Sequence, residues 1–375
     1  MKRVIGALAI AIMGSQAENL VNVDGYLRGT YQAHDVKGDR TYKDDALGGK
    51  LHINTAKVDG VSLGVSFYTS NSIINSENRG LVSLRGESHK SYTLLGEAYL
   101  KAESKRSLFK IGRQELDTPF ADRDDIGMIP NTFEAAIFET KEIENTTIFL
   151  GQLQKMAGVD AKEIDRFTKI NGSKNMQVLG VTYEGISSLT LAGWYYNLKG
   201  AEVDKIAYLE ATYEKELEQI TYQLALQYAN ESYRNQPNAK VYGGLVSITD
   251  NRVGVSLTTA YTKAKDNSAF SGFGGGPLFS NSEYLILDNA GEDGDALWIG
   301  VEYDASNVGL EGLTLGLGEI MLKDKAFKKS TEFDCVVGYE VSSELEVHLI
   351  ASKLKAVNVG EDDAKHLRIF ANYNF

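Results

Sequence analysis

Cysteine, proline and positive charge are scarce in this chain of 375 residues. Its single cysteine, Cys335, cannot form an intramolecular disulfide, so the fold does not depend on a disulfide framework. The formal net charge of -12 argues against nucleic acid as a partner. Only four prolines accompany 20 tyrosines and 37 glycines, and this composition favours strands over helices.

Long apolar runs are also missing. After residue 17 no stretch of about 18 apolar residues occurs, so we expect no transmembrane helix. If such a chain enters a bilayer, it must do so as a closed β-barrel, because only a barrel then pairs every backbone N–H and C=O group.

The N-terminus has the three parts of a secretory signal peptide. Residues 2–3 are basic, residues 4–13 are apolar, and Ser-Gln-Ala at 15–17 offers small residues at a cleavage site. We therefore expect residues 1–17 to be removed on export, and residues 18–375 to form one domain. The alternative is an ordinary buried strand or helix at the N-terminus.

Alternating segments of about ten residues fill the remaining chain, and that is the length of a tilted strand that crosses a bilayer. Eighteen are predicted, at residues 23–32, 47–56, 61–70, 92–101, 106–116, 133–141, 146–155, 175–184, 189–199, 205–216, 220–229, 240–249, 252–263, 296–305, 313–322, 331–340, 344–353 and 365–375.

Connections between these segments alternate in length. The long ones are 33–46, 71–91, 117–132, 156–174, 200–204, 230–239, 264–295, 323–330 and 354–364, whereas short links include 57–60, 102–105, 142–145, 185–188, 217–219, 250–251 and 341–343. Long loops at one end and tight turns at the other are typical of an outer-membrane barrel. A propeller or a sandwich has no reason to separate them in this way.

Side-chain alternation in these segments suits a wall between lipid and water. In 220–229, apolar or aromatic residues occupy every even position and small or polar residues every odd one. Lipid favours the first face and a water-filled lumen the second. A soluble sandwich would place the same apolar face in its core, so alternation alone leaves a soluble protein open.

The last residues, LRIFANYNF at 367–375, alternate to the end of the chain. We expect this strand to pair with the first one and close the ring. The aromatic pair Tyr373 and Phe375 resembles the assembly signal of outer-membrane proteins of Gram-negative bacteria. That resemblance implies the barrel-assembly machinery as a partner.

The stretch FKIGRQELDTPFADRDDIGMIPNTFEA, residues 109–135, is the most informative one. Its GRQ, TP and NTFE motifs and the acidic segment before Pro130 resemble the third-loop region of the outer-membrane porin D family. The resemblance implies an eighteen-stranded outer-membrane channel for small hydrophilic solutes, with amino acids or small carboxylates as preferred classes. It also implies that the loop folds inward and narrows the pore. Gly127 departs from the family pattern, which has an arginine near this point, so a complete anion-binding face is not implied.

A narrow pore with low-dielectric walls focuses the field of fixed charges, and this is how it selects solutes. The predicted pore constriction consists of Asp117, Asp122, Arg123, Asp124 and Asp125. The bases predicted for the lumenal wall are Arg28, Lys50, His52, Lys110 and Arg368, accompanied by Glu97 and Glu302. An acidic loop opposite a basic wall would orient zwitterions or carboxylates. The alternative for each group is a solvated surface charge.

No catalytic residue, metal or cofactor is expected. HExxH and CxxC motifs are absent. The segment 288–295 resembles a calcium loop but lacks the D-x-D-x-D-G order, so we expect a solvated extracellular loop there. Residues 270–280 are glycine-rich, and we interpret them as a flexible segment or lid.

Three functions remain open at this point. The first is a passive porin with a solute preference, and the second is a structural or adhesive outer-membrane barrel without significant transport. The third is an exported soluble β-protein that binds glycans or other partners. The sequence is compatible with a monomer or a trimer.

Overall fold

The computed structural model of the chain describes residues 20–39, 41–73, 82–86, 90–170, 172, 174–199, 202–326, 328–356 and 363–375. The expected signal peptide, residues 1–17, lies outside these residues. Among the described residues, no helix is long and apolar enough to cross a membrane.

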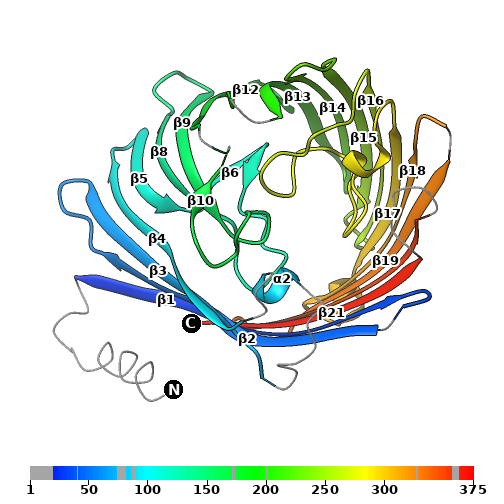
Figure 1. Ribbon diagram of the computed structural model, residues 1–375, viewed down its shortest axis with the longest axis horizontal. Coiled ribbons are helices and arrows are strands. Elements are labelled where there is room, and N and C mark those ends of the chain that lie inside the picture. The colour runs from blue at the N-terminus through cyan, green and yellow to red at the C-terminus, as the bar shows by residue number, and fades with distance from the viewer. Residues whose placement is uncertain are drawn as a thin grey trace.

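Eighteen strands form the wall of a closed antiparallel barrel (Figure 1). Each strand pairs with its neighbours along the chain, and β1 also pairs with β21, from Tyr26 opposite Asn374 to Val36 opposite Ala364. The wall strands are β1 (Val21–Val36), β2 (Thr41–Thr55), β3 (Val61–Asn71), β4 (Tyr92–Glu103), β5 (Ser107–Gln114), β8 (Thr132–Thr140), β9 (Thr146–Ala157), β11 (Met176–Ile186), β12 (Leu189–Asn197), β13 (Val203–Leu217), β14 (Ile220–Tyr233), β15 (Ala239–Asp250), β16 (Val255–Lys265), β17 (Asp295–Asp304), β18 (Leu313–Lys323), β19 (Lys329–Glu340), β20 (Leu345–Ala356) and β21 (Ala364–Asn374).

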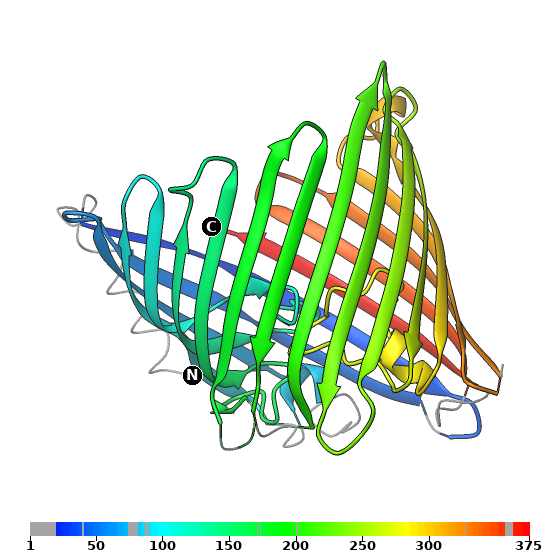
Figure 2. The ribbon, with the colours of Figure 1, turned by 90° about the horizontal axis from the view of Figure 1, so that it is seen from above.

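Six short elements accompany the wall. They are α2 (Val82–Arg85), β6 (Asp117–Thr118), β7 (Ala121–Asp122), β10 (Thr168–Lys169), η1 (Leu287–Ala290) and η2 (Ala305–Val308). Five of them lie in connections at the long-loop end, where β10 pairs with β9, and η2 lies at the turn end. Figure 2 shows the barrel from the side, with tight turns at the top and long connections at the bottom.

The eighteen-stranded barrel expected from the sequence is confirmed, and every predicted segment corresponds to one wall strand. Two predictions about connections are wrong. Most of 33–46 belongs to β1 and β2, which stay paired as far as Asp35 opposite Thr41, because β1 also pairs with β21 up to Val36 and because Asp44 of β2 is buried in an ion pair with Arg85. Residues 252–254 form a turn, where Gly254 takes a positive φ of 71° and β16 starts after it.

The two faces of the wall differ as the alternation predicts. On β14, Leu224 and Leu226 are exposed on the outside, while Ala225 and Ala229 are buried toward the interior. The chain terminus is held in the same wall, because Gly25 and Phe375 exchange two backbone hydrogen bonds of 3.1 and 3.0 Å. The rings of Tyr373 and Phe375 lie exposed on the outer face.

Inward-folded connections fill much of the barrel interior at the long-loop end (Figure 1). One buried cluster joins Phe120, Leu278 and Leu285 from these connections to Tyr196 and Tyr208 of the wall. A second cluster joins other connection residues, Leu84, Met128, Ile129 and Ile164, to Tyr68 and Leu94 of the wall. The interior therefore contains its own hydrophobic core, which holds the loops against the wall.

Candidate pore constriction

The third loop, residues 115–131, is anchored at its first half to the far wall. Strands β6 and β7 form a small hairpin whose tip residue, Phe120, is fully buried. The Phe120 N–H donates to the Tyr196 hydroxyl of β12 at 3.2 Å, and the Phe120 ring lies 5.5 Å from the Tyr196 ring and 5.6 Å from the Tyr208 ring. Burial of these aromatic rings fixes the hairpin in place.

The second half of the third loop is anchored to β1. The Arg28 guanidinium donates to both carboxylate oxygens of Asp125, at 2.6 and 2.9 Å. It also donates to the Gly127 carbonyl at 2.7 Å and to the Asn372 side chain at 2.7 Å. Because the guanidinium of Arg28 is occupied by these acceptors, its role here is to position the loop. The loop thus crosses the interior from β12 to β1.

The seventh loop, residues 266–294, folds inward against the third. Phe273 pairs with Ala121 in a parallel bridge, and its N–H donates to the Phe120 carbonyl at 2.9 Å. The Asp122 carboxylate accepts the N–H groups of Gly275 and Gly276, each at 3.2 Å. A side chain at the neighbouring Gly274 would meet this carboxylate at 2.4 Å, so glycine is required there.

The solvated extracellular loop was expected only for residues 288–295, and the part of the seventh loop that precedes them lies largely inside the barrel. Leu278, Leu285 and Leu287 are buried inside the barrel. The Glu332 carboxylate of β19 accepts the Tyr284 N–H at 3.1 Å and the Leu285 N–H at 2.6 Å. Sequence reasoning missed this anchor because it predicted an inward fold for the third loop alone.

All five predicted constriction residues line one hollow, which we call the acidic hollow. It has a volume of about 490 Å³ and is lined by Asp117, Thr118, Pro119, Asp122, Arg123, Asp124, Asp125, Gly276 and Pro277. Four carboxylates face a single arginine there, and one of the four, Asp125, is already paired with Arg28. The hollow therefore carries a net negative charge when its carboxyl groups are ionised.

Asp124 has the most perturbed protonation in the acidic hollow. Burial, followed by repulsion from Asp160, raises the pKa of Asp124 to about 8. The Asp160 carboxylate is held nearby because it accepts the Asn131 side-chain N–H at 2.6 Å. Burial also raises the pKa of Asp122, although three backbone N–H groups oppose that effect. Asp124 is therefore mostly protonated at neutral pH.

Three of the predicted wall bases gather around two carboxylates. The Lys50 ammonium lies 2.8 Å from Glu115 and 3.0 Å from Glu97. Lys110 is 3.9 Å from Glu97, and the His52 ring nitrogen lies 3.8 Å from the same residue. This side of the lumen is consequently a paired network in which the bases do not stand alone.

The other predicted bases are separated from this network. Arg28 holds the third loop, and Arg368 of β21 pairs with Glu283 of the seventh loop. The Arg368 guanidinium also lies 5.4 Å from the centre of the Tyr284 ring. Arg123, which belongs to the acidic hollow, is 60% exposed and 3.8 Å from Glu115. It is the basic side chain with the greatest access to solutes in that hollow.

Sequence reasoning placed Glu97 on the lumenal face but missed Glu115, Glu283 and Glu332. The signal for Glu332 was present, because Glu332 and Asp334 share one face of a predicted strand and lipid would not accept two carboxylates. No such signal existed for Glu115 and Glu283. Glu115 belonged to the predicted segment 106–116 but lies just beyond the end of β5 at Gln114, and Glu283 lies in a loop, so alternation fixes the direction of neither side chain.

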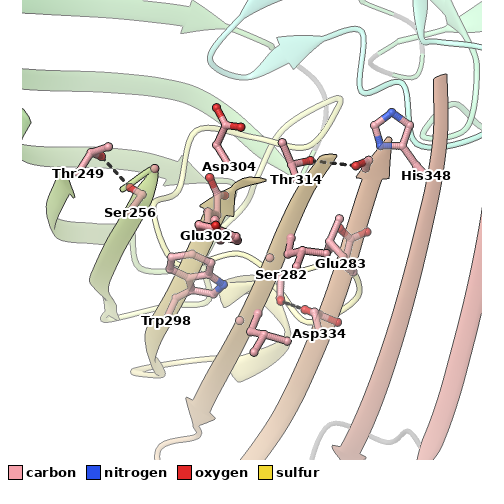
Figure 3. Close-up of a pocket in the computed structure, with 18 of the residues that line it drawn as sticks. Thr249, Ser256, Ser282, Glu283, Trp298, Glu302, Asp304, Thr314, Asp334 and His348 are labelled. Atoms are coloured by element: carbon pink, nitrogen blue, oxygen red, sulfur yellow. Dashed lines mark hydrogen bonds between the residues drawn. The ribbon is translucent and has the colours of Figure 1, made fainter. Parts of the chain in front are cut away.

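A larger chamber of about 950 Å³ lies on the turn side of the seventh loop, along β15 to β20 (Figure 3). Glu302 and Trp298 of β17 line it, as do Glu283 of the seventh loop, Asp334 of β19 and His348 of β20. Within the described part of the chain, its lining includes no Lys or Arg. A solute that passes the acidic hollow on this side enters a second acidic space.

The calcium-like segment 288–295 uses its first carboxylate internally. Asp288 accepts the N–H of Ser271 at 2.7 Å and its hydroxyl at 2.8 Å. Burial raises the pKa of Asp288 to about 6. Over the residues that the structure describes, no group of three or more His, Cys, Asp or Glu side chains is arranged to hold a metal ion.

Comparisons with known proteins agree with this architecture. Residues 61–375 match the family described as outer membrane porin, OprD family. The structure resembles Pseudomonas aeruginosa OpdQ with a TM-score of 0.79 and 17% identity, over 96% of this chain and 99% of that one. It resembles OccK9 (OpdG) of the same organism with a TM-score of 0.82 and 18% identity, over 95% and 98%. For OccD3 (OpdP), the TM-score is 0.79 at 16% identity, over 96% and 92%. No curated protein matches the sequence.

Proposed function

The chain belongs to the OprD family of outer-membrane porins, and we propose that its third and seventh loops together form the solute-selecting constriction of a passive channel. It is a channel for small solutes in the cell outer membrane. The observation behind the proposal is the contact of these two loops at Ala121 and Phe273, which lines the acidic hollow with the five predicted constriction residues.

The proposed preference is for solutes with an amino group, amino acids first among them. Asp117 and Asp122 present negative charge in the acidic hollow, and the chamber beyond it contains further carboxylates but no Lys or Arg among its described lining residues. Arg123 supplies one accessible positive charge at the same point. Such an arrangement attracts the ammonium group of a zwitterion and offers one partner for its carboxylate. Small carboxylates without an amino group are the weaker candidates.

Planar-bilayer conductance with a reversal-potential measurement tests this proposal. We expect an open channel with cation preference in a KCl gradient at pH 9, where Asp124 is ionised, and a reduced preference in the variant Asp117→Asn/Asp124→Asn. The matched control is Glu142→Gln/Glu144→Gln, which neutralises two exposed carboxylates in a tight turn at the other end. Unchanged selectivity in the first variant would refute the constriction assignment. An absence of current would favour a structural or adhesive barrel instead.

Export and assembly complete the proposal. Residues 1–17 act as a signal peptide, and residues 18–375 form the single mature barrel. The exposed rings of Tyr373 and Phe375 at the end of β21 are available to the barrel-assembly machinery. Both a monomer and a trimer are compatible with this proposal. The family consists of channels, and we propose no enzymatic activity or cofactor for this chain.

A further inference from the structure

Lysines stand directly opposite lysines on neighbouring strands at the long-loop end of the wall. The cross-strand pairs are Lys240 with Lys265, Lys323 with Lys329 and Lys353 with Lys365. Side chains in such pairs lie about 5 Å apart at Cβ, and like charges at this distance destabilise a sheet. Like-charged pairs of this kind gain from an anionic neighbour, and the sheet itself supplies two, because Asp295 stands opposite Lys323 and Asp35 stands opposite Lys365.

These lysines point outward. Lys353 and Lys355 are exposed and alternate with the buried Ser352 and Leu354, while Lys323 follows the buried Leu322. Lys365 is exposed between the buried Ala364 and His366. Their positive charges therefore face the surroundings of the barrel and not its lumen.

The pairs also begin where the lipid-facing apolar band ends. Each of these lysines has an apolar outward neighbour two residues nearer the turn end. These neighbours are Met321 for Lys323, Ala351 for Lys353 and Leu367 for Lys365. Two residues of strand span about 7 Å. The ammonium groups thus reach the level at which lipid headgroups begin.

Partial neutralisation from within the chain exists but does not remove the excess charge. Asp266 lies 2.8 Å from Lys240, so the first pair carries an internal counter-ion. At β20 and β21, a hollow of about 300 Å³ on the rim is lined by Lys37, Lys353, Lys355 and Lys365, with Asp35 and Asp363 as its acidic members. Lys37 and Asp363 are 3.3 Å apart but well exposed, and such a pair is weak. The hollow keeps an excess of two positive charges.

We propose that this rim, named the lysine rim and defined by Lys323, Lys329, Lys353, Lys355 and Lys365, binds the phosphate groups of phosphorylated lipid headgroups in the outer leaflet. The ammonium group of lysine binds phosphate as a compact point charge. Lysines next to a membrane surface gain binding energy from anionic headgroups. The phosphate occupies the rim hollow and relieves the repulsion between Lys353 and Lys365.

The proposal is tested with the purified full-length mature barrel in nanodiscs of phosphatidylcholine that contain bisphosphoryl lipid A. Native mass spectrometry counts the lipid A molecules that stay bound after release from the nanodisc. The variant Lys323→Gln/Lys329→Gln/Lys353→Gln/Lys365→Gln should retain lipid A about tenfold more weakly, because headgroup phosphate loses its counter-charges. A matched control, Lys57→Gln/Lys105→Gln/Lys141→Gln/Lys215→Gln, removes four exposed lysines at the turn end and should bind as the wild type does.

Three further arms decide the source and the chemistry of the ligand. Dephosphorylated lipid A should bind as weakly to the wild type as bisphosphoryl lipid A binds to the variant. Inorganic phosphate at millimolar concentration should not displace lipid A, and full displacement would show a site for free phosphate, which overturns the lipid assignment. The same four positions changed to arginine should keep binding, since the charge is retained. Equal retention by the glutamine variant and the wild type would overturn the proposal, provided that both variants keep the heat-modifiable migration of a folded barrel.

Discussion

Positive side chains inside the barrel and at its outer rim differ in the charge of their neighbours. In the lumen, Arg28 donates to both oxygens of Asp125, and Lys50 lies within 3.0 Å of two carboxylates. On the rim, Lys323 faces Lys329 and Lys353 faces Lys365 across the sheet. The interior bases are therefore satisfied by the chain itself, whereas Lys353 and Lys365 line a rim hollow that keeps an excess of positive charge. Substitution of lumenal residues and of rim residues tests this difference.

The largest effect is expected from Arg28, which is the main polar anchor of the third loop at β1. Arg28→Ala leaves Asp125 and the Gly127 carbonyl without their donor, and loss of one member of a buried pair costs about 3 kcal/mol. We expect the loop to leave β1, so single-channel conductance should rise about twofold because the narrowest section widens. Arg28→Lys should show an intermediate conductance, since it keeps the charge but loses the fork. A conductance equal to that of the wild type in Arg28→Ala would mean that burial of Met128 and Ile129 alone holds the loop.

Glu332 anchors the seventh loop in the same way, and its replacement should have the next largest effect. Glu332→Gln keeps one acceptor oxygen for the N–H groups of Tyr284 and Leu285 but replaces the other with an amide donor, which weakens the anchor by about 0.5–1.5 kcal/mol. We expect increased open-channel current noise from a mobile seventh loop. Glu340→Gln, at an exposed position of the same strand, is the control and should be silent. Equally quiet traces from both variants would count against an anchoring role.

Sequence patterns were sufficient for the wall but not for its contents. Alternation in 220–229 predicted which side chains face lipid, because a period of two is a local property of a strand. The loops follow a different logic. Phe120 meets Tyr196 from 76 residues away, and Asp122 meets Gly275 from 153 residues away. No local period encodes such contacts, so the burial of the seventh-loop leucines inside the barrel was not predicted.

The constriction residues also could be predicted only in part. Their acidic character follows from ADRDD at 121–125, and the five residues do share one hollow. The partner and the protonation of each carboxylate could not be predicted from the sequence. Asp125 is occupied by Arg28, Asp122 is occupied by glycine N–H groups, and Asp124 is protonated by its neighbourhood. Sequence composition alone counts four equal carboxylates, whereas the fold assigns them different roles.

Asp124 gives a pH dependence of moderate size. Its pKa of about 8 lies above the ordinary value for aspartate, so the group is neutral at pH 6 and ionised at pH 9. Cation selectivity, measured from the reversal potential in a KCl gradient, should therefore increase between pH 7 and pH 9. Asp124→Asn should remove this increase and should resemble the wild type at pH 6. If the variant keeps the full pH dependence, another group titrates in the pore. High salt should weaken the effect in both proteins because it screens the fixed charge.

The smallest effect is expected from substitution of single lysines. It tests most directly the difference between lysines in the lumen and lysines on the outer rim. Lys353→Gln removes a repulsive cross-strand pair, so in detergent free of phosphate it should stabilise the barrel by about 0.2–1 kcal/mol. Lys50→Gln removes the counter-charge of Glu97 and Glu115, so it should destabilise the barrel in every medium. Thermal unfolding followed by gel migration measures both. Addition of bisphosphoryl lipid A should reverse the sign for Lys353→Gln alone, because the wild-type lysine then has a phosphate to neutralise. A stabilisation that persists in lipid A would mean that this lysine pair is only tolerated, and that the rim and the lumen do not differ in the way proposed.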